Sequence, residues 1–155
     1  MANDSADTAH VIAPPPLIYA LPLLAGLLLN HFRPQAVLPP AWAHLLGPLI
    51  VLLGFGALPA VLAFRRAGTH PQPWRPATAL VVTGPYRFSR NPMYVGATLF
   101  YIGVSLWGNS LWPLLLLPVV LVIMSRGVIA REEAYLERLF GDEYRSYRSR
   151  VRRWL

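Results

Sequence analysis

Two polar clusters carry the residues that are able to do chemistry in this chain. The first is residues 83–96, TGPYRFSRNPMYVG, in which Arg87 and Arg90 lie just before Pro92. The second is the carboxylate pair Glu132-Glu133. Guanidinium groups bind carboxylates, and carboxylates bind ammonium groups, through charge-assisted hydrogen bonds. The two clusters together therefore suit a zwitterionic ligand that has both an ammonium and a carboxylate group.

The first cluster leads into a predicted helix that starts at Pro92, with Asn91 at the N-cap. The start of a helix has free backbone N–H groups and the positive end of the helix dipole. Arg87 and Arg90 lie within one turn of it, which favours an anion site for a carboxylate or phosphate. The alternative is that both arginines only anchor the chain at the lipid headgroups.

The second cluster lies on a predicted helix, where adjacent side chains point about 100° apart. Glu132 shares a face with Ile129 and Leu136, whereas Glu133 shares a face with Arg126. We therefore expect Glu132 to be the inward carboxylate, and a buried carboxylate needs a partner. A cationic ligand, ligand hydroxyls or one of three arginines remain open as that partner: Arg87, Arg90 and Arg131.

The composition indicates a membrane protein. The chain has 155 residues, of which 55% are hydrophobic and 14% charged, against about 25% charged residues in soluble domains. All 14 basic residues are Arg, and the net charge is +7. The absence of Cys excludes thiolate chemistry, and the four scattered His have no metal-ligand spacing, so we expect no metal.

Four apolar stretches predict an all-α, multi-pass transmembrane protein with about four spanning helices. They cover residues 17–32, 42–64, 92–107 and a stretch from 111 onward. A tight turn, Gly108-Asn109-Ser110, joins the last two into a helical hairpin. The last stretch becomes amphipathic after Ser125 and is expected to form a cytoplasmic extension that Gly141 caps.

We expect one integral-membrane domain over residues 1–155. Its parts are a disordered tail (1–13), two transmembrane helices (14–66), a cytoplasmic loop (67–91), a helical hairpin with the catalytic region (92–141) and a basic tail (142–155) that suits anionic lipid. Five Arg lie at residues 65–90 and eight after Ser125. This distribution predicts that both termini are cytoplasmic and that both polar clusters lie on that side. The Arg-only composition favours a bacterial chain, hence the cell inner membrane.

Four motifs resemble the integral-membrane methyltransferases, a superfamily that includes isoprenylcysteine carboxyl methyltransferases and phospholipid N-methyltransferases. They are Gly84-Pro85-Tyr86; Arg90-Asn91-Pro92-Met93-Tyr94 with Gly96; Glu132-Glu133 with Leu136; and Phe140-Gly141-Asp142-Glu143-Tyr144 with Tyr147. The usual family form is Arg-His-Pro-x-Tyr. Here Asn91 replaces the His, which removes any titratable role at that position.

The resemblance implies S-adenosylmethionine as cofactor and a cytoplasmic pocket between the two clusters. It assigns the cofactor-binding residues as Tyr86, Arg90, Asn91, Pro92, Tyr94, Glu132 and Glu133. The implied acceptor is a lipid or prenylated molecule that enters sideways between the helices and is methylated on a carboxyl oxygen or an amine. Glu132 is the candidate to assist an amine, and Arg131 or Arg126 to orient an acidic acceptor.

Two other functions remain open. One is an NADPH-dependent membrane sterol-type reductase, a group with a similar Arg-His-Pro-like motif, although its second motif lacks the Glu-Glu pair. The other is a non-enzymatic membrane scaffold. Nucleic-acid binding is not expected beside four apolar spans.

Overall fold

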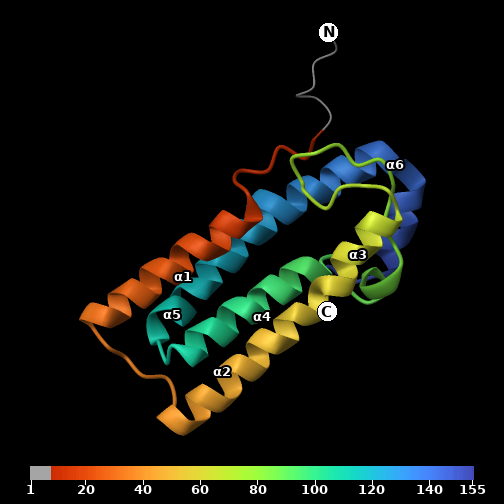
Figure 1. The fold of residues 1–155 in the computed structure, drawn as a ribbon. Coiled ribbons are helices and arrows are strands. Elements are labelled where there is room, and N and C mark those ends of the chain that lie inside the picture. Colours follow the sequence, from red (N-terminus) through yellow and green to blue (C-terminus); the bar gives the residue numbers. More distant parts are fainter. Residues whose placement is uncertain (1–7) are drawn as a thin grey trace.

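A computed structural model describes residues 8–155, which form an all-helical chain (Figure 1). Its elements are α1 (Pro15–Phe32), α2 (Pro40–Gly54), η2 (Phe55–Ala57), α3 (Leu58–Arg66), η3 (Gly84–Arg87), α4 (Pro92–Trp107), α5 (Leu111–Ile123), η4 (Met124–Ile129) and α6 (Ala130–Arg150). Within residues 8–155 the only β-type pairing is one isolated bridge between Ser89 and Arg152. The predicted all-α class is confirmed.

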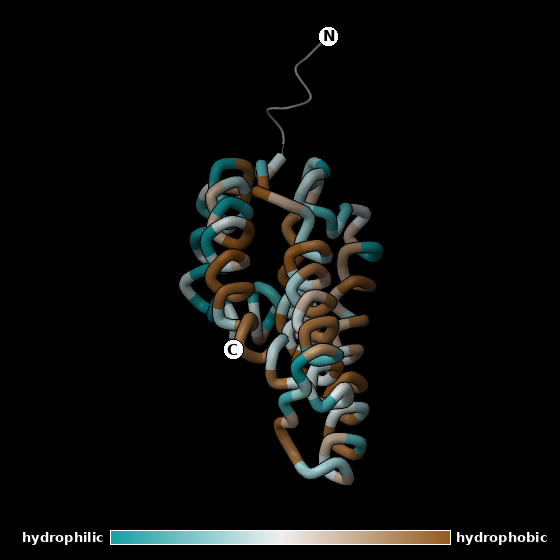
Figure 2. Tube along the Cα trace, turned by 90° about the vertical axis from the view of Figure 1, so that its left-hand side faces the viewer, coloured by the Kyte–Doolittle hydropathy of each residue, from teal (hydrophilic) through white to brown (hydrophobic). Residues whose placement is uncertain are grey.

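The helices are long and apolar enough to cross a membrane. Three helical stretches are both long enough and apolar enough: Pro15–Phe32, Pro40–Arg66 and Leu111–Arg150. A fourth helix, Pro92–Trp107, is apolar but shorter. Large hydrophobic side chains such as Leu21 and Leu52 are more than 60% exposed on them, and hydrophobic residues run along most of their length (Figure 2). The chain is therefore an integral membrane protein with about four helices, as predicted.

Helices α2 and α4 pack closely because glycines face each other across their contact. Gly47 and Gly54 lie seven residues apart on α2, as do Gly96 and Gly103 on α4. A Cβ atom added at Gly54 would lie 2.9 Å from the Gly96 carbonyl oxygen, too close for any side chain. Small residues on both helices therefore allow this close approach. Figure 1 shows α2 beside α4 and α1 beside α5.

The ends of the bundle differ. At one end the loop of residues 33–39, between α1 and α2, is hydrogen-bonded to the turn of residues 108–110, between α4 and α5. Asn109 Oδ1 accepts hydrogen bonds from the Val37 and Leu38 N–H groups at 2.9 and 3.0 Å. The loop of residues 67–91 and helix α6 lie together at the opposite end (Figure 1). The prediction that both polar clusters share one side of the bundle is therefore confirmed.

The start of the described chain corrects one prediction. The disordered tail was expected over residues 1–13, of which 1–7 lie outside the described residues. Residues 8–13 are packed, because Ile12 donates its N–H to the Gly127 carbonyl at 3.3 Å and Ala9 is buried. A side chain on residue 127 would clash with Ile12, so this contact needs glycine.

Gly141 interrupts α6, as expected from a helix cap. Its φ of +54° lies in the left-handed region, and two helical stretches meet there at a kink. The chain after Gly141 is helical again, up to Arg150. Tyr144 and Tyr147 are buried, and the Tyr147 hydroxyl donates to the Tyr86 carbonyl at 2.8 Å. This second stretch therefore folds back onto the loop before α4.

Candidate functional site

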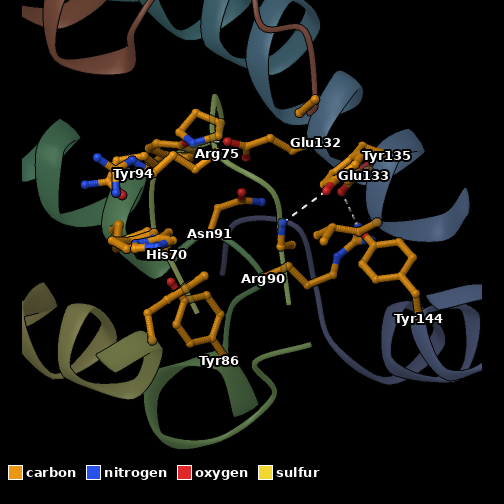
Figure 3. A pocket seen from close by; sticks show the side chains of 18 of the residues that line it. His70, Arg75, Tyr86, Arg90, Asn91, Tyr94, Glu132, Glu133, Tyr135 and Tyr144 are labelled. Atoms are coloured by element: carbon orange, nitrogen blue, oxygen red, sulfur yellow. Dashed lines mark hydrogen bonds and ion pairs between the residues drawn. The ribbon is translucent and has the colours of Figure 1, made fainter. Parts of the chain in front are cut away.

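A polar cavity lies where the loop of residues 67–91, the start of α4 and helix α6 meet. Its volume is about 100 Å³, or about 750 Å³ when all the adjoining space open to solvent is counted. Six of the seven residues predicted to bind a cofactor line it: Tyr86, Arg90, Asn91, Tyr94, Glu132 and Glu133. Figure 3 shows these side chains around one space. These six residues, which are distant in the sequence, therefore share one cavity.

Glu133 is the centre of an ion-pair network in this cavity. It is 7% exposed, and its Oε1 lies 3.1 Å from Arg90 Nη2 and 3.1 Å from Arg153 Nε. A second bond joins Arg153 Nη2 to Glu133 Oε2. Hydrogen bonding to this carboxylate raises the pKa of Arg153 above its ordinary value. Two guanidinium groups around one carboxylate leave the network with a net charge of +1.

Glu132 also faces the cavity, and its Oε1 accepts a 2.6 Å hydrogen bond from the Tyr94 hydroxyl. The prediction that Glu132 points inward is confirmed, but its protein partner is a phenol and none of the three arginines considered. The two carboxylates do bind different partners, but the expectation that Glu132 is the one inward carboxylate is wrong, because Glu133 is buried as well. Helix α6 is enclosed from two sides, by Tyr94 of α4 and by Arg90 of the loop, so adjacent carboxylates each find a buried partner.

The π-helical turn η4 contributes to this error. Its hydrogen bonds span five residues instead of four, which shifts the faces of the helix that follows it. Arg126 lies in this turn, so its spacing to Glu133 is not that of a regular α-helix. A stripe counted from Arg126 at 3.6 residues per turn therefore misassigns the face of Glu133.

Several buried polar atoms in the cavity have no hydrogen-bond partner among residues 8–155. They are Arg90 Nε and Nη1, the Tyr86 hydroxyl and Gln72 Oε1, and all three residues line the cavity. A buried polar group without a partner costs about 1–3 kcal/mol. Burial raises the pKa of Tyr86, so its phenol stays neutral and is able to donate. The cavity thus presents donors for an anionic group and an acceptor for an N–H group.

Three predicted site residues do not line the cavity. Arg131 Nη1 donates to the His10 carbonyl at 2.7 Å, so it holds the segment before α1. Arg126 is exposed on η4, and Pro92 is buried beneath the first turn of α4, on the side of Leu53 and Gly56. The geometry brings neither arginine to a position from which it would orient an acceptor here.

Other cavity residues were not predicted as site residues. Tyr144 and Tyr147 line it, and their place just after Gly141 in a recognisable motif was the available signal. Gln72 belongs to a proline-rich loop whose length alone suggested function. Arg153 does not line the cavity but contacts Glu133, and it had no sequence signal because this contact spans 20 residues.

A second, mostly apolar cavity adjoins the polar one. It has a volume of about 490 Å³, or about 1,140 Å³ when the space open to solvent is counted, and lies between α1 and α4, with Tyr19, Ala97 and Tyr101 in its wall. Met93 and Tyr94 line both cavities, so the two spaces share a wall at the start of α4. This arrangement places an apolar chain and a polar ligand side by side.

Metal chemistry has no evident site here. Among the described residues no group of three or more His, Asp or Glu side chains is arranged to hold a metal ion. Of the two cavity carboxylates, Glu133 is paired with Arg90 and Arg153, and Glu132 with the Tyr94 phenol.

Two curated proteins resemble this chain over part of its length. A 64-residue segment is 52% identical to an uncharacterized protein of Haemophilus influenzae, covering 41% of this chain and 100% of that protein. A 72-residue segment is 38% identical to the protein-S-isoprenylcysteine O-methyltransferase of Schizosaccharomyces pombe, covering 46% of this chain and 30% of that enzyme. No solved structure matches the chain at a comparable level of significance.

The family comparison covers a larger share of the chain. The phospholipid methyltransferase family model matches residues 42–143, about two thirds of the sequence. The match includes α3, the loop of residues 67–91, α4 and the carboxylate pair of α6, and residues from each of these elements line the polar cavity. The chain therefore belongs to the phospholipid methyltransferase family of integral membrane proteins.

Proposed function

We propose that this protein transfers the methyl group of S-adenosylmethionine to a carboxyl oxygen or an amine nitrogen of a lipid or lipid-linked acceptor. The observation that carries the proposal is the pair of adjoining cavities, one with unpaired donors beside a carboxylate, the other apolar. A zwitterionic cofactor suits the first cavity, and a hydrocarbon chain suits the second.

The residues of the polar cavity fit the two charged ends of this cofactor. Arg90 Nε and Nη1 and the Tyr86 hydroxyl are the donors that would hold its carboxylate. Glu132 is the carboxylate that would hold its ammonium group, and Tyr86 or Tyr94 offers an aromatic face to the adenine ring. When bound, S-adenosylmethionine supplies a methyl group already activated on a sulfonium.

The protein's contribution is therefore mainly to position the reactants in a site with little water. The apolar cavity would hold the acceptor chain so that its polar end reaches the wall shared at Met93 and Tyr94. A carboxylate acceptor needs no base. An amine acceptor has to lose a proton, and a carboxylate oxygen of Glu132 is the group we assign to receive it, with the Tyr94 hydroxyl fixing its orientation.

We further propose that the polar cavity faces the cytoplasm and that the protein resides in a bacterial inner membrane with both termini cytoplasmic. The arginines support this orientation, because 13 of the 14 lie at the cavity end of the bundle and only Arg33 belongs to the other end. Positively charged residues concentrate on the cytoplasmic side of membrane proteins.

Calorimetry with S-adenosylmethionine tests the cofactor assignment on the detergent-solubilised protein. Glu132→Gln is expected to weaken binding by at least ~1 kcal/mol, because a neutral amide replaces a charged acceptor of similar shape. The matched control is Glu137→Gln on the same helix, where the carboxylate pairs with exposed Arg145 and Arg148 outside the cavity. Equal affinity of the wild type and Glu132→Gln would remove Glu132 from the site.

A further inference from the structure

Residues 151–154, which we call the strap, lie directly against the segment that precedes α4. We propose that the strap completes the polar cavity and that Arg153 is a positioning residue, which keeps Arg90 available for the carboxylate of an amino-acid-bearing ligand. This inference rests on the proposed function, because it concerns how the same cavity recognises one end of its cofactor.

The strap is held by three consecutive residues of the Ser-Arg-Asn segment. The Arg90 N–H donates to the Arg152 carbonyl at 2.9 Å, and Asn91 Nδ2 donates to the Arg153 carbonyl, also at 2.9 Å. Ser89 pairs with Arg152 in the isolated bridge. The strap therefore takes a fixed position relative to Arg90, which carries two of the unpaired donors of the cavity.

This contact explains what the Asn91 side chain does in the structure. It occupies the N-cap position of α4, but its side chain makes no capping hydrogen bond and instead binds the strap. A neutral amide donates to a carbonyl in the same way at every pH. We therefore assign Asn91 to hold the strap, although the side chain also lines the cavity.

Arg153 determines how Arg90 uses its own N–H groups. Arg153 binds both oxygens of Glu133, whereas Arg90 reaches only Oε1, through Nη2. A lone arginine beside a carboxylate tends to bind it with two parallel N–H groups. By occupying Glu133, Arg153 prevents that arrangement, so that Nε and Nη1 of Arg90 remain without a protein partner.

The same contact sets the charge of the network formed by Arg90, Arg153 and Glu133. With Arg153 present the network of Arg90, Arg153 and Glu133 carries a net charge of +1, and without it the remaining pair is neutral. A buried positive charge with unfilled donors attracts a carboxylate, whereas a neutral, mutually satisfied pair does not. Arg153 thus acts on the ligand through Glu133 and Arg90 and not by contact.

The simplest alternative is that the strap only stabilises the fold and has no specific role in ligand recognition. Trp154 packs against the hydrophobic cluster that includes Tyr19 and Tyr94, so loss of the strap would disturb the whole site. That alternative predicts equal losses for all ligands of the cavity. The positioning role predicts a loss confined to ligands that carry the amino-acid carboxylate.

Two nucleosides separate these roles by calorimetry on the full, detergent-solubilised chain. S-adenosylhomocysteine carries the amino-acid end, and 5′-methylthioadenosine lacks it. We expect Arg153→Ala to weaken S-adenosylhomocysteine about tenfold or more, the effect of losing a charge-assisted hydrogen bond. The affinity for 5′-methylthioadenosine should change less than about twofold, since it makes no such bond.

Two further variants complete the test. Arg152→Ala removes the neighbouring, exposed guanidinium of the same strap and leaves its backbone contact, so both affinities should equal those of the wild type. Arg153→Lys keeps the charge but not the two-pronged bond, and should restore part of the S-adenosylhomocysteine affinity. If Arg153→Ala cannot be purified, the affinities of Arg153→Lys for the two nucleosides are compared instead, and a selective loss for S-adenosylhomocysteine is again expected.

The outcomes are distinct. A selective loss of S-adenosylhomocysteine in Arg153→Ala supports the positioning role. Unchanged affinity for S-adenosylhomocysteine, or equal losses for both nucleosides, would overturn it. A wild-type protein that binds neither S-adenosylmethionine nor S-adenosylhomocysteine would overturn the proposed function itself, and this inference with it.

Discussion

Replacing Arg90 with methionine is expected to lower the affinity for S-adenosylmethionine about a hundredfold. Arg90 holds the two unpaired N–H donors of the cavity, and each charge-assisted hydrogen bond contributes roughly 1.5–3 kcal/mol. Glu133 keeps Arg153 as a partner in this variant, so the carboxylate is not left alone. Calorimetry with the cofactor measures the effect directly.

Arg87→Met is the matched control, because Arg87 lies three residues away in the same loop, is exposed and does not line the polar cavity. It removes the same charge from the same face of the bundle. If the arginines only attract anions through their general positive field, both variants should lose affinity equally, and that result would contradict a specific role for Arg90.

Replacing Glu133 with leucine is expected to destabilise the protein by about 3–5 kcal/mol, the usual cost of removing one partner from a buried ion pair. The Arg90 side chain is only 10% exposed, and Glu133 is its ion-pair partner among the described residues. Leucine has a similar volume but leaves the guanidinium uncompensated. Unfolding in detergent, followed by tyrosine and tryptophan fluorescence, measures the change.

Glu137→Leu on the same helix provides the comparison. Its partners Arg145 and Arg148 have side chains that are 54% and 48% exposed, and exposed ion pairs contribute about 0–1 kcal/mol. Glu133→Gln keeps hydrogen-bonding capacity, so its free energy of unfolding should lie between those of Glu133→Leu and Glu137→Leu. Equal stabilities of Glu133→Leu and Glu137→Leu would show that the buried network does not stabilise the fold.

Arg90→Met and Glu133→Leu test different functions of the ion-pair network around Glu133. Arg90 presents donors to the cavity and Glu133 holds Arg90 in place, so the first variant should affect binding more than folding. The second variant should affect both. This division follows from geometry, because Glu133 is bonded on both oxygens whereas Arg90 retains two free N–H groups.

Much of the fold followed from the sequence because its signals are local. Asn91-Pro92 marks the start of α4, and the Gly108-Asn109-Ser110 turn marks its end, as the structure has them. The distribution of arginines predicted that the loop before α4 and the carboxylate pair share one end of the bundle. Hydrophobic length and charge asymmetry act over single segments, so one sequence is enough to interpret them.

The details of the site depended on contacts that no local pattern encodes. The buried position of Glu133 results from enclosure of α6 by two other elements, and the π-helical turn η4 breaks the spacing from which its face was counted. The strap contact joins Asn91 to a carbonyl 62 residues away. Composition suggested that the basic tail lies on lipid, whereas Tyr144 and Tyr147 pack inside.

The most direct test of the central claim is methyl transfer. The purified protein is incubated with S-adenosylmethionine carrying a labelled methyl group and with a bacterial membrane lipid extract, and the lipid phase is analysed for label and product mass. We predict labelled lipid with the wild type and the Arg87→Met control, and background label with Arg90→Met. Absence of label above a protein-free reaction, with the wild-type protein folded, would contradict the assignment of the two cavities to cofactor and lipid acceptor.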